Sequence, residues 1–279
     1  MTDPSSRFAG TGLAGLLGPN DPPAVTIVNP QGRAAALLVC DHASNAVPAA
    51  LGDLGLDVEA RNRHIAWDIG AAEVARHLAE ILDAPAILSG YSRLVVDCNR
   101  ALDDPTAMRQ ISDRTVIPGN RGLDATARAQ RAESCYWPYH RAVAATIASF
   151  TERRLVPAVI SVHSCCAAWK GVQRPWHVGV LSNSDRRMAD LLIALLSRDS
   201  ALCIGDNQPY SGFDPHGYTI ETHALADSRP NVLLEIRQDL IGSPEGARHW
   251  AGIVGAALAA VLAHPELVRA RNSAVRRVS

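Results

Sequence analysis

Apolar residues in this chain occur either in short unbroken runs or at a spacing of three and four positions. Short runs bounded by turn residues are typical of buried strands, and the wider spacing is typical of amphipathic helices. Runs at 34–40, 155–162 and 231–236 predict three buried strands, and shorter strands are predicted at 25–29, 86–89, 93–97, 178–181 and 203–205. Helices are predicted over 64–82, 125–153, 185–197 and 244–263, and Pro138 should bend or split the second of these.

Strands alternate with helices along most of the chain. This order predicts one α/β domain with a mostly parallel sheet that is covered on both faces. We expect residues 1–23, which are rich in Gly, Pro and Ser, to form an extended N-terminal arm, residues 24–268 to form the single domain, and the basic residues 269–279 to be a disordered tail. The polar segment 103–124 predicts a long loop, and loops of this length are often functional.

The charge balance indicates which class of partner the protein binds, and the cysteine content indicates the redox state of its compartment. The chain has 27 basic and 28 acidic residues, and this balance favours a small molecule over nucleic acid or an anionic membrane surface. The six cysteines lack CxxC spacing and several lie in or beside apolar runs, so we expect reduced thiols and a cytoplasmic location. We expect neither a signal peptide nor a membrane-spanning segment. Formation of a homo-oligomer stays open.

His42 and His163 each come at the end of a predicted strand. The carboxyl ends of parallel strands share one edge of a sheet, and ligand groups gather there. Catalytic zinc sites usually have three protein ligands, commonly two histidines and a carboxylate. Asp68 is the favoured third ligand because its predicted helix follows His42. The alternatives are a surface or capping role for Asp68, structural roles for the histidines, and Asn45 as a weaker ligand.

Glu235 lies inside the apolar run 231–236, where an ionised carboxylate is costly unless it is paired or catalytic. We expect it to act as the general base, taking a proton from metal-activated water and passing it to the leaving amine. The alternative is a buried pair with Arg237, since side chains two residues apart point to the same face of a strand.

Two arginines mark the segment after the predicted strand at 86–89. Arg100 can bind a carboxylate in bidentate fashion with Asn99 donating beside it, which indicates an anionic substrate. Arg93 or His223 would stabilise the oxyanion, and His223 ends a segment in which polar and apolar residues alternate. Solvated arginines and a core or surface histidine are the alternatives.

Nucleophilic catalysis has weaker support in the sequence. The chain has no Gly-x-Ser-x-Gly elbow, which a serine hydrolase of the α/β class would need. Cys165 and Cys166 follow His163 closely, but adjacent residues of a strand point to opposite faces. A Cys–His pair is therefore the less favoured hypothesis.

Six phrases between residues 40 and 240 carry a family resemblance: Cys40-Asp-His-Ala-Ser-Asn45, Trp67-Asp-Ile-Gly70, Ser92-Arg-Leu-Val-Val-Asp-Cys-Asn-Arg100, Ser161-Val-His-Ser164, Gly217-Tyr-Thr-Ile220 with His223, and Leu234-Glu-Ile-Arg-Gln-Asp-Leu240. In these phrases the sequence resembles the N-formylglutamate amidohydrolase family, which is similar in turn to zinc carboxypeptidases and aspartoacylase-like deacylases. The resemblance implies an α/β/α sandwich on a mixed sheet and a zinc-dependent amidase that removes an N-acyl group from an amino acid. It also implies that Arg100 holds the substrate, and we assign Tyr218 to substrate binding as well.

One position departs from the related pattern. Carboxypeptidase-like sites place Glu three residues after the first histidine, and this chain has Asn45 there, so its carboxylate ligand must come from elsewhere. We expect a hydrolase of N-formylglutamate-like amides in which zinc, or another divalent ion, is bound by His42, Asp68 and His163. The alternatives are a carboxypeptidase-like peptidase for short peptides and a non-catalytic binding protein for acidic small molecules.

Overall fold

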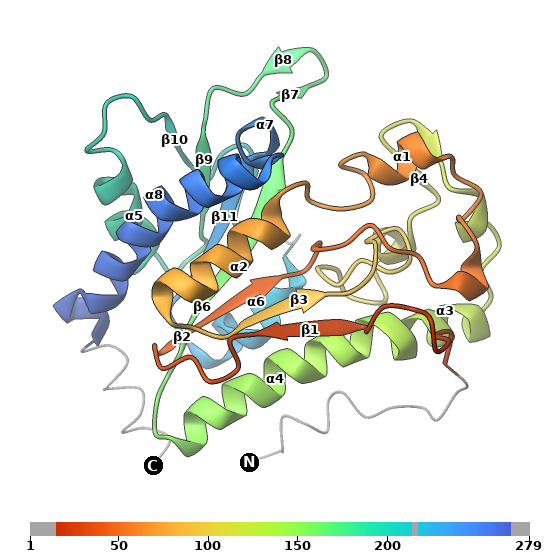
Figure 1. The fold of residues 1–279 in the computed structure, drawn as a ribbon, viewed down its shortest axis with the longest axis horizontal. Helices are drawn as coiled ribbons and strands as arrows, with labels where there is room; N and C mark the ends of the chain where they lie inside the picture. The colour runs from red at the N-terminus through yellow and green to blue at the C-terminus, as the bar shows by residue number, and fades with distance from the viewer. Residues whose placement is uncertain (1–14, 214–216, 269–279) are drawn as a thin grey trace.

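Seven strands form one mixed sheet in the order β1-β3-β2-β6-β11-β9-β10 (Figure 1). The computed structural model describes residues 15–213 and 217–268. The strands are β1 (Val25–Val28), β2 (Ala36–Cys40), β3 (Ala86–Ser89), β6 (Ala158–Cys165), β9 (Val178–Leu181), β10 (Ile204–Asp206) and β11 (Asn231–Arg237). Neighbours from β3 through β2 and β6 to β11 are parallel, whereas β1 is antiparallel to β3 and β9 is antiparallel to β11. The predicted α/β class with a mostly parallel sheet is confirmed.

Both faces of the sheet are buried, as expected for parallel strands covered by helices. In β2, Leu38 and Cys40 belong to one hydrophobic core and Leu37 and Val39 to a second core on the opposite face. Helices α2 (Ala71–Leu82), α5 (Ala189–Leu196) and α8 (Pro244–Ala263) contribute to the first core, and α4 (Trp137–Glu152) contributes to the second. The sheet therefore forms the middle layer between two sets of helices (Figure 1).

Short elements connect these layers. They are the helices α1 (Val58–Asn62), α3 (Ala125–Arg131), α6 (Tyr218–His223) and α7 (Gln238–Ile241), a π-helical turn at Ala132–Tyr136, and 3-10 turns at Ala49–Leu51, Pro105–Met108, Pro118–Asn120 and Leu225–Asp227. Two hairpins, β4 (Ile111–Ser112) with β5 (Thr115–Val116) and β7 (Ala168–Trp169) with β8 (Val172–Gln173), lie outside the main sheet. The helix predicted over 125–153 consists of α3, the π-helical turn and α4 in direct succession, and Pro138 lies in the first turn of α4, just after the π-helical turn.

Three predicted elements differ from the structure. The helix expected over 64–82 begins only at residue 71, because Gly70 is in the left-handed region with φ of 80°. The strand expected at 93–97 is a series of turns whose backbone hydrogen bonds are local, such as that from the Val95 N–H to the carbonyl of Ser92. The alternating segment that ends at His223 is the helix α6.

Helix α8 bears on the expectation that the chain has no membrane-spanning segment. It has 20 residues and is long and apolar enough to cross a membrane by length and composition alone. In this fold its buried residues, including Trp250, Val254 and Leu258, belong to the first core, against α2 and α5. All six cysteines are free. The expected disordered tail 269–279 lies outside the described residues, and so do residues 1–14 of the expected arm.

Candidate active site

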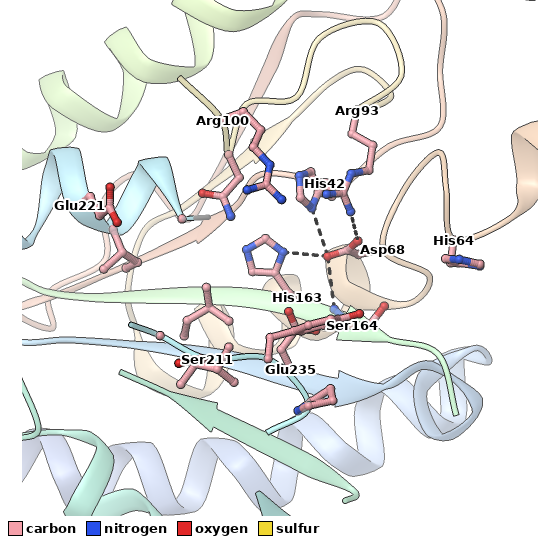
Figure 2. A pocket seen from close by; sticks show the side chains of 18 of the residues that line it. His42, His64, Asp68, Arg93, Arg100, His163, Ser164, Ser211, Glu221 and Glu235 are labelled. Atoms are coloured by element: carbon pink, nitrogen blue, oxygen red, sulfur yellow. Dashed lines mark hydrogen bonds and ion pairs between the residues drawn. The ribbon is translucent and has the colours of Figure 1, made fainter. Parts of the chain in front are cut away.

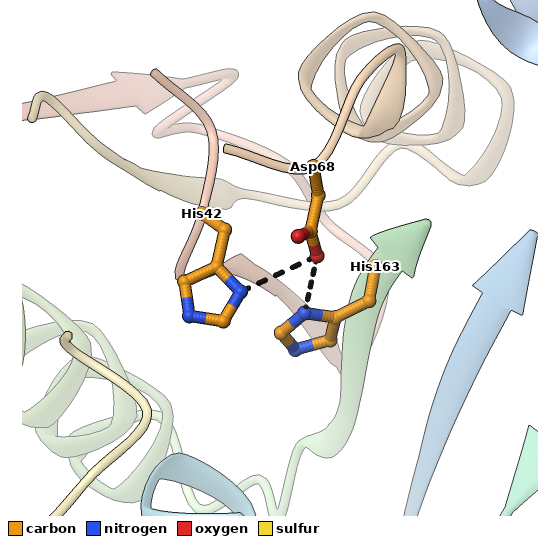
Figure 3. Close-up of side chains that lie close together, drawn as sticks. All are labelled: His42, Asp68 and His163. Carbon is orange, nitrogen blue, oxygen red and sulfur yellow. Dashed lines mark hydrogen bonds and ion pairs between the residues drawn. The ribbon is translucent and has the colours of Figure 1, made fainter. Parts of the chain in front are cut away.

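Three buried side chains that offer metal ligands lie together at the carboxyl edge of the sheet (Figure 3). The Nδ1 atoms of His42 and His163 lie 3.3 and 2.7 Å from the same atom, Oδ2 of Asp68. One ligand atom from each residue lies within 4.8 Å of the others. The fold thus brings the three predicted ligands together. Asn45, the weaker alternative, donates instead to the side chain of Asn62 at 2.8 Å.

Sheet register and one turn position these three side chains. β2 and β6 are parallel neighbours in which Val39 pairs with Ser161, and His42 is the second residue after β2 while His163 is still within β6. Asp68 lies in the turn before α2, where its N–H donates to the carbonyl of His42 at 3.0 Å. A helix through this turn would have placed Asp68 differently, so the late start of α2 is what brings the carboxylate to the histidines.

Each histidine also contacts a second carboxylate through its other ring nitrogen. Nε2 of His42 is hydrogen bonded to Asp97 Oδ1 at 2.8 Å. Nε2 of His163 lies 3.1 Å from Asp41 Oδ2, an ion-pair contact without hydrogen-bond angles, and the hydroxyl of Thr219 donates to Asp41 Oδ1 at 2.6 Å. Outer carboxylates of this kind fix the tautomer and orientation of metal-binding histidines. Both Nδ1 atoms are therefore directed at the same point, beside Asp68.

The charges at the three ligands favour a cation. Burial raises the pKa of Asp68, but the opposing effects of His42 and His163 are larger in sum and hold it below its usual value. Burial likewise opposes ionisation of Asp41, whose pKa is nevertheless lowered to about 2 by His163. Burial lowers the pKa of His163, and the two carboxylates raise it well above its usual value. Ionised carboxylates surround these imidazoles at neutral pH, as a divalent ion requires.

Glu235 lies beside His163, its register partner on the neighbouring parallel strand. Its side chain is buried, and Oε2 has no hydrogen-bond partner among the described residues. Burial is the main cause that raises the pKa of Glu235 to about 7. A carboxyl group with such a pKa can accept and return a proton near neutral pH. The alternative pair with Arg237 is not formed, because that guanidinium binds Asp239 at 2.8 Å.

A glycine brings a loop close to Glu235. Gly179 of β9 is the antiparallel register partner of Glu235. A Cβ atom at Gly179 would lie 2.0 Å from the carbonyl oxygen of Gln208 and 3.3 Å from Cβ of Glu235. Only a residue without a side chain permits this approach, so the loop after β10 packs directly over the strand next to the carboxylate.

A cavity of about 630 Å³ lies beside the ligands, and three arginines line it. Nε and Nη2 of Arg93 donate to Asp97 Oδ2 at 3.1 and 3.0 Å, and Nη1 lies 3.4 Å from Asp68 Oδ1. Arg100 also lines the cavity (Figure 2). Arg109 contributes the third guanidinium. These three guanidinium groups are side chains that can bind an anionic group.

Asn99 lines the cavity and is held firmly. Its N–H donates to Asp97 Oδ1 at 2.9 Å, and its Oδ1 accepts from the N–H of Thr219 at 3.1 Å. The side-chain amide nitrogen is the atom through which Asn99 could donate to a substrate carboxylate. Tyr218, by contrast, is not among the cavity-lining residues; its ring packs at 5.1 Å from that of His140.

His223 is bound by another histidine rather than facing the cavity. Its Nε2 lies 2.9 Å from Nδ1 of His140, whose own Nε2 lies 2.9 Å from the carbonyl of Cys98. Because that carbonyl can only accept, His140 donates through Nε2 and accepts from His223 through Nδ1. Burial is the main cause that lowers the pKa of His140 to about 4 and of His223 to about 3. Both rings are neutral at pH 7.

Two aromatic side chains form walls of the cavity near its rim. Trp169 comes from the β7–β8 hairpin and Tyr210 from the loop after β10. The guanidinium of Arg174 lies over both rings, at 5.9 and 4.8 Å from their centroids, and donates to the Tyr210 hydroxyl at 3.2 Å. Arg174 thus joins two segments that are separate in the sequence.

The thiol of Cys165 is buried, which raises its pKa to about 12 and disfavours the thiolate that a Cys–His mechanism needs.

Sequence analysis did not assign four residues that matter at this site. Asp41 and Asp97 both lie within the quoted phrases, so their proximity to His42 and Arg100 was a usable signal. Arg109 and His140 lie outside every phrase, and no local pattern identifies them.

A family model and two solved structures are similar to this chain. The model of the N-formylglutamate amidohydrolase family matches residues 34–242, a range that includes all three ligands and Glu235. No curated protein matches the chain. A solved gene product of Agrobacterium tumefaciens is 35% identical, with a TM-score of 0.84 over 88% of this chain and 99% of that one. An N-formylglutamate amidohydrolase from Ralstonia eutropha JMP134 is 20% identical, with a TM-score of 0.62 over 92% and 99%, and supports the fold alone. The chain belongs to the N-formylglutamate amidohydrolase family.

Proposed function

We propose that this protein is a metal-dependent amidohydrolase that removes the formyl group from an N-formyl amino acid resembling N-formylglutamate. The observation that carries the proposal is the position of buried Glu235 next to the group of His42, Asp68 and His163, within one cavity. Family membership supports amide hydrolysis. The guanidinium groups in the cavity support an acidic substrate.

The residues present fit a divalent ion. Two imidazoles and a carboxylate match the ligands of catalytic zinc. The outer carboxylates Asp41 and Asp97 contact the Nε2 atoms of the two imidazoles. His42, Asp68 and His163 would bind the ion, with Zn²⁺ as first choice and another divalent metal as an alternative. When bound, such an ion acts as a Lewis acid toward the amide carbonyl and makes water a stronger acid.

Glu235 supplies the proton transfer in this proposal. Its carboxylate takes a proton from the attacking water as the water oxygen bonds to the formyl carbon. The same carboxyl then gives that proton to the nitrogen as the carbon–nitrogen bond breaks, so formate and a free amino acid leave. The pKa of about 7 suits both steps. Activity therefore depends on one carboxyl group that changes its protonation state twice.

Other cavity residues bind and orient the substrate. Arg100 and Asn99 hold its α-carboxylate, and Arg93, already fixed by Asp97, stabilises the negative charge that develops on the carbonyl oxygen. His223 donates to His140 and does not line the cavity, so Arg93 alone receives this role. The substrate is a small molecule, and a cytoplasmic location with reduced thiols goes with the proposal.

Replacing Glu235 tests the proposal directly. In the zinc-loaded protein, Glu235→Gln should lower kcat for formate release by about 10²- to 10⁴-fold, because the amide cannot accept the proton, while zinc affinity stays unchanged. Glu221→Gln is the matched control, since Glu221 lines the same cavity without adjoining the ligands. Full activity of Glu235→Gln would remove it as the base.

A substrate comparison separates the proposal from its alternatives. Wild-type protein is assayed for formate release from N-formyl amino acids and for release of C-terminal residues from dipeptides. Formate release is the expected result. Dipeptide cleavage alone would indicate a peptidase, and the absence of both activities, with no zinc bound on titration, would indicate a binding protein.

A further inference from the structure

Arg109 is a cavity-lining arginine whose side chain makes little use of its donors. It follows the 3-10 turn Pro105–Met108 in the long loop between β3 and α3. Its Nη2 lies 3.4 Å from Asp97 Oδ2, and its buried Nε has no hydrogen-bond partner among the described residues. A guanidinium carries five N–H donors in a planar fork. One long contact leaves most of that capacity unexplained.

A buried network of hydrogen bonds fixes the loop that carries Arg109. The Nδ2 of Asn120 donates to the carbonyls of Arg109 and Leu94, both at 2.8 Å. The Oδ1 of Asn120 accepts from Nη1 of Arg131 at 2.6 Å, and Arg131 is 2% exposed. This buried network fixes the backbone at Arg109, which reduces the entropy that the side chain loses when it binds a ligand.

Charge around Arg109 favours an anion. Arg93 and Arg100 line the same cavity, and like charges held together at low dielectric repel one another. Asp97 Oδ2 already accepts two hydrogen bonds from Arg93, so Arg109 is not needed to neutralise it. Among the acidic residues that line the cavity, Asp113 is paired with Arg63 at 2.6 Å. Glu221 also lines the cavity. A ligand carboxylate beside Arg109 would offset the repulsion among the guanidiniums.

We propose that Arg109 is a specificity-determining residue that binds a second carboxylate of the substrate, on its side chain, while Arg100 binds the first. The substrate class is then N-formyl amino acids with an acidic side chain. This inference rests on the proposed function. A guanidinium can hold a carboxylate through two parallel hydrogen bonds, which a neutral side-chain amide of the same shape cannot match.

The test compares N-formylglutamate with N-formylglutamine, which has nearly the same shape and no side-chain charge. Arg109→Met in the zinc-loaded protein should lower kcat/KM for N-formylglutamate by about 10- to 100-fold, mainly through KM, and change that for N-formylglutamine by less than about threefold. Arg109→Lys, which keeps the charge but not the fork, should be intermediate. Arg121→Met is the matched control, because Arg121 is exposed in the same loop and does not line the cavity.

Binding of the free amino acids gives a second readout that does not depend on turnover. Calorimetry should show that wild-type protein prefers glutamate to glutamine and that Arg109→Met removes the preference. Equal loss on both substrates, or no loss on either, would overturn the inference and leave the proposed function standing. A glutamate preference that Arg109→Met abolishes, without formate release by the wild type, would overturn the proposed function alone. Comparison of the Tm values of Arg109→Met and Arg109→Lys identifies a folding defect. If Arg109→Met is destabilised, the substrate preference of Arg109→Lys decides whether the inference holds.

Discussion

The orientation of the His42 ring and of the His163 ring each depends on one carboxylate at the ring nitrogen that faces away from Asp68. Asp97 accepts from His42 at the ring nitrogen that faces away from Asp68, and Asp41 lies at the corresponding nitrogen of His163. Asp97 also binds Arg93 at 3.0 Å and contacts Arg109 at 3.4 Å. A residue outside the three ligands therefore controls both the donor geometry and the positive charge at the substrate side.

Asp97→Asn should weaken zinc binding by about 10- to 100-fold, because the amide keeps the shape but loses the negative charge that makes the His42 ring a stronger donor. Titration of zinc against a competing chelator measures the affinity. Asp104→Asn is the control, since Asp104 is the half-buried N-cap of the next 3-10 turn of the chain and is not one of the three ligands. Equal affinities for wild type and Asp97→Asn would show that Asp97 has no influence on the ligand.

The pair of His140 and His223 makes stability depend on pH. Their pKa values of about 4 and about 3 in the folded protein lie below the value of about 6.5 expected in the unfolded chain. As pH falls below about 6.5, the unfolded state binds protons first, so this contribution to stability is complete above that pH and is lost toward pH 4. At pH 5 the loss is roughly 2 kcal/mol for each ring.

His223→Asn should reduce this pH dependence, because an amide still donates to His140 but cannot be protonated in this range. Urea unfolding at pH 7.5 and pH 5 should give a difference in the free energy of unfolding that is smaller than in wild type by roughly 2 kcal/mol. His249→Asn, at an exposed position of α8, should leave the difference unchanged. Identical pH dependence in wild type and His223→Asn would contradict the assignment.

Single residues of the site were predictable only where residue type and strand position coincided. His42, His163 and Glu235 each occur in or directly after a buried apolar run, so the parallel sheet predicts that they converge. The partner of His42 at Nε2 is 55 residues away, and the partner of His223 is 83 residues away. Such pairings depend on loop paths, which periodicity does not encode.

At the scale of elements, prediction succeeded where burial is uniform and failed where one backbone angle decides. β11 and α8 match their predicted bounds to within one residue, because an unbroken apolar run and a capped apolar helix leave little choice. The apolar spacing at residues 65 and 69 continues that of α2, yet Gly70 interrupts the helix. A Cβ there would lie 2.2 Å from the carbonyl oxygen of Ile241, so contact with α7 selects this glycine.

Gly70→Ala should destabilise the protein by about 2 kcal/mol or more and weaken zinc binding, because φ of 80° is strained for alanine and the clash displaces the turn that carries Asp68. Gly122→Ala separates the two causes, since Gly122 has φ of 65° with nothing within 4 Å of its Cβ position. Strain alone should cost about 1 kcal/mol there and leave zinc affinity unchanged. Urea unfolding and zinc titration measure both effects, and equal losses for the two variants would refute the clash.

At the scale of the whole molecule, the metal ligands link parts of the fold that are far apart in the sequence. His42 follows β2, Asp68 lies before α2 and His163 lies in β6, so the three ligands are separated by 26 and 95 residues. They approach one another only when the sheet and α2 are assembled. An ion bound by all three therefore binds the folded state and not the unfolded chain.

Zinc should raise Tm through this linkage. At free zinc of 100 times Kd the stabilisation is about 2.7 kcal/mol, which corresponds to a shift of roughly 5–10 °C for a chain of this size. The shift should decrease at pH 5.5, because protons compete with the ion for the imidazoles. His163→Ala should abolish the shift. His64→Asn should retain it, since His64 lines the same cavity but is not one of the three ligands. A shift that survives His163→Ala would place the zinc elsewhere, and thermal unfolding with and without zinc distinguishes these results.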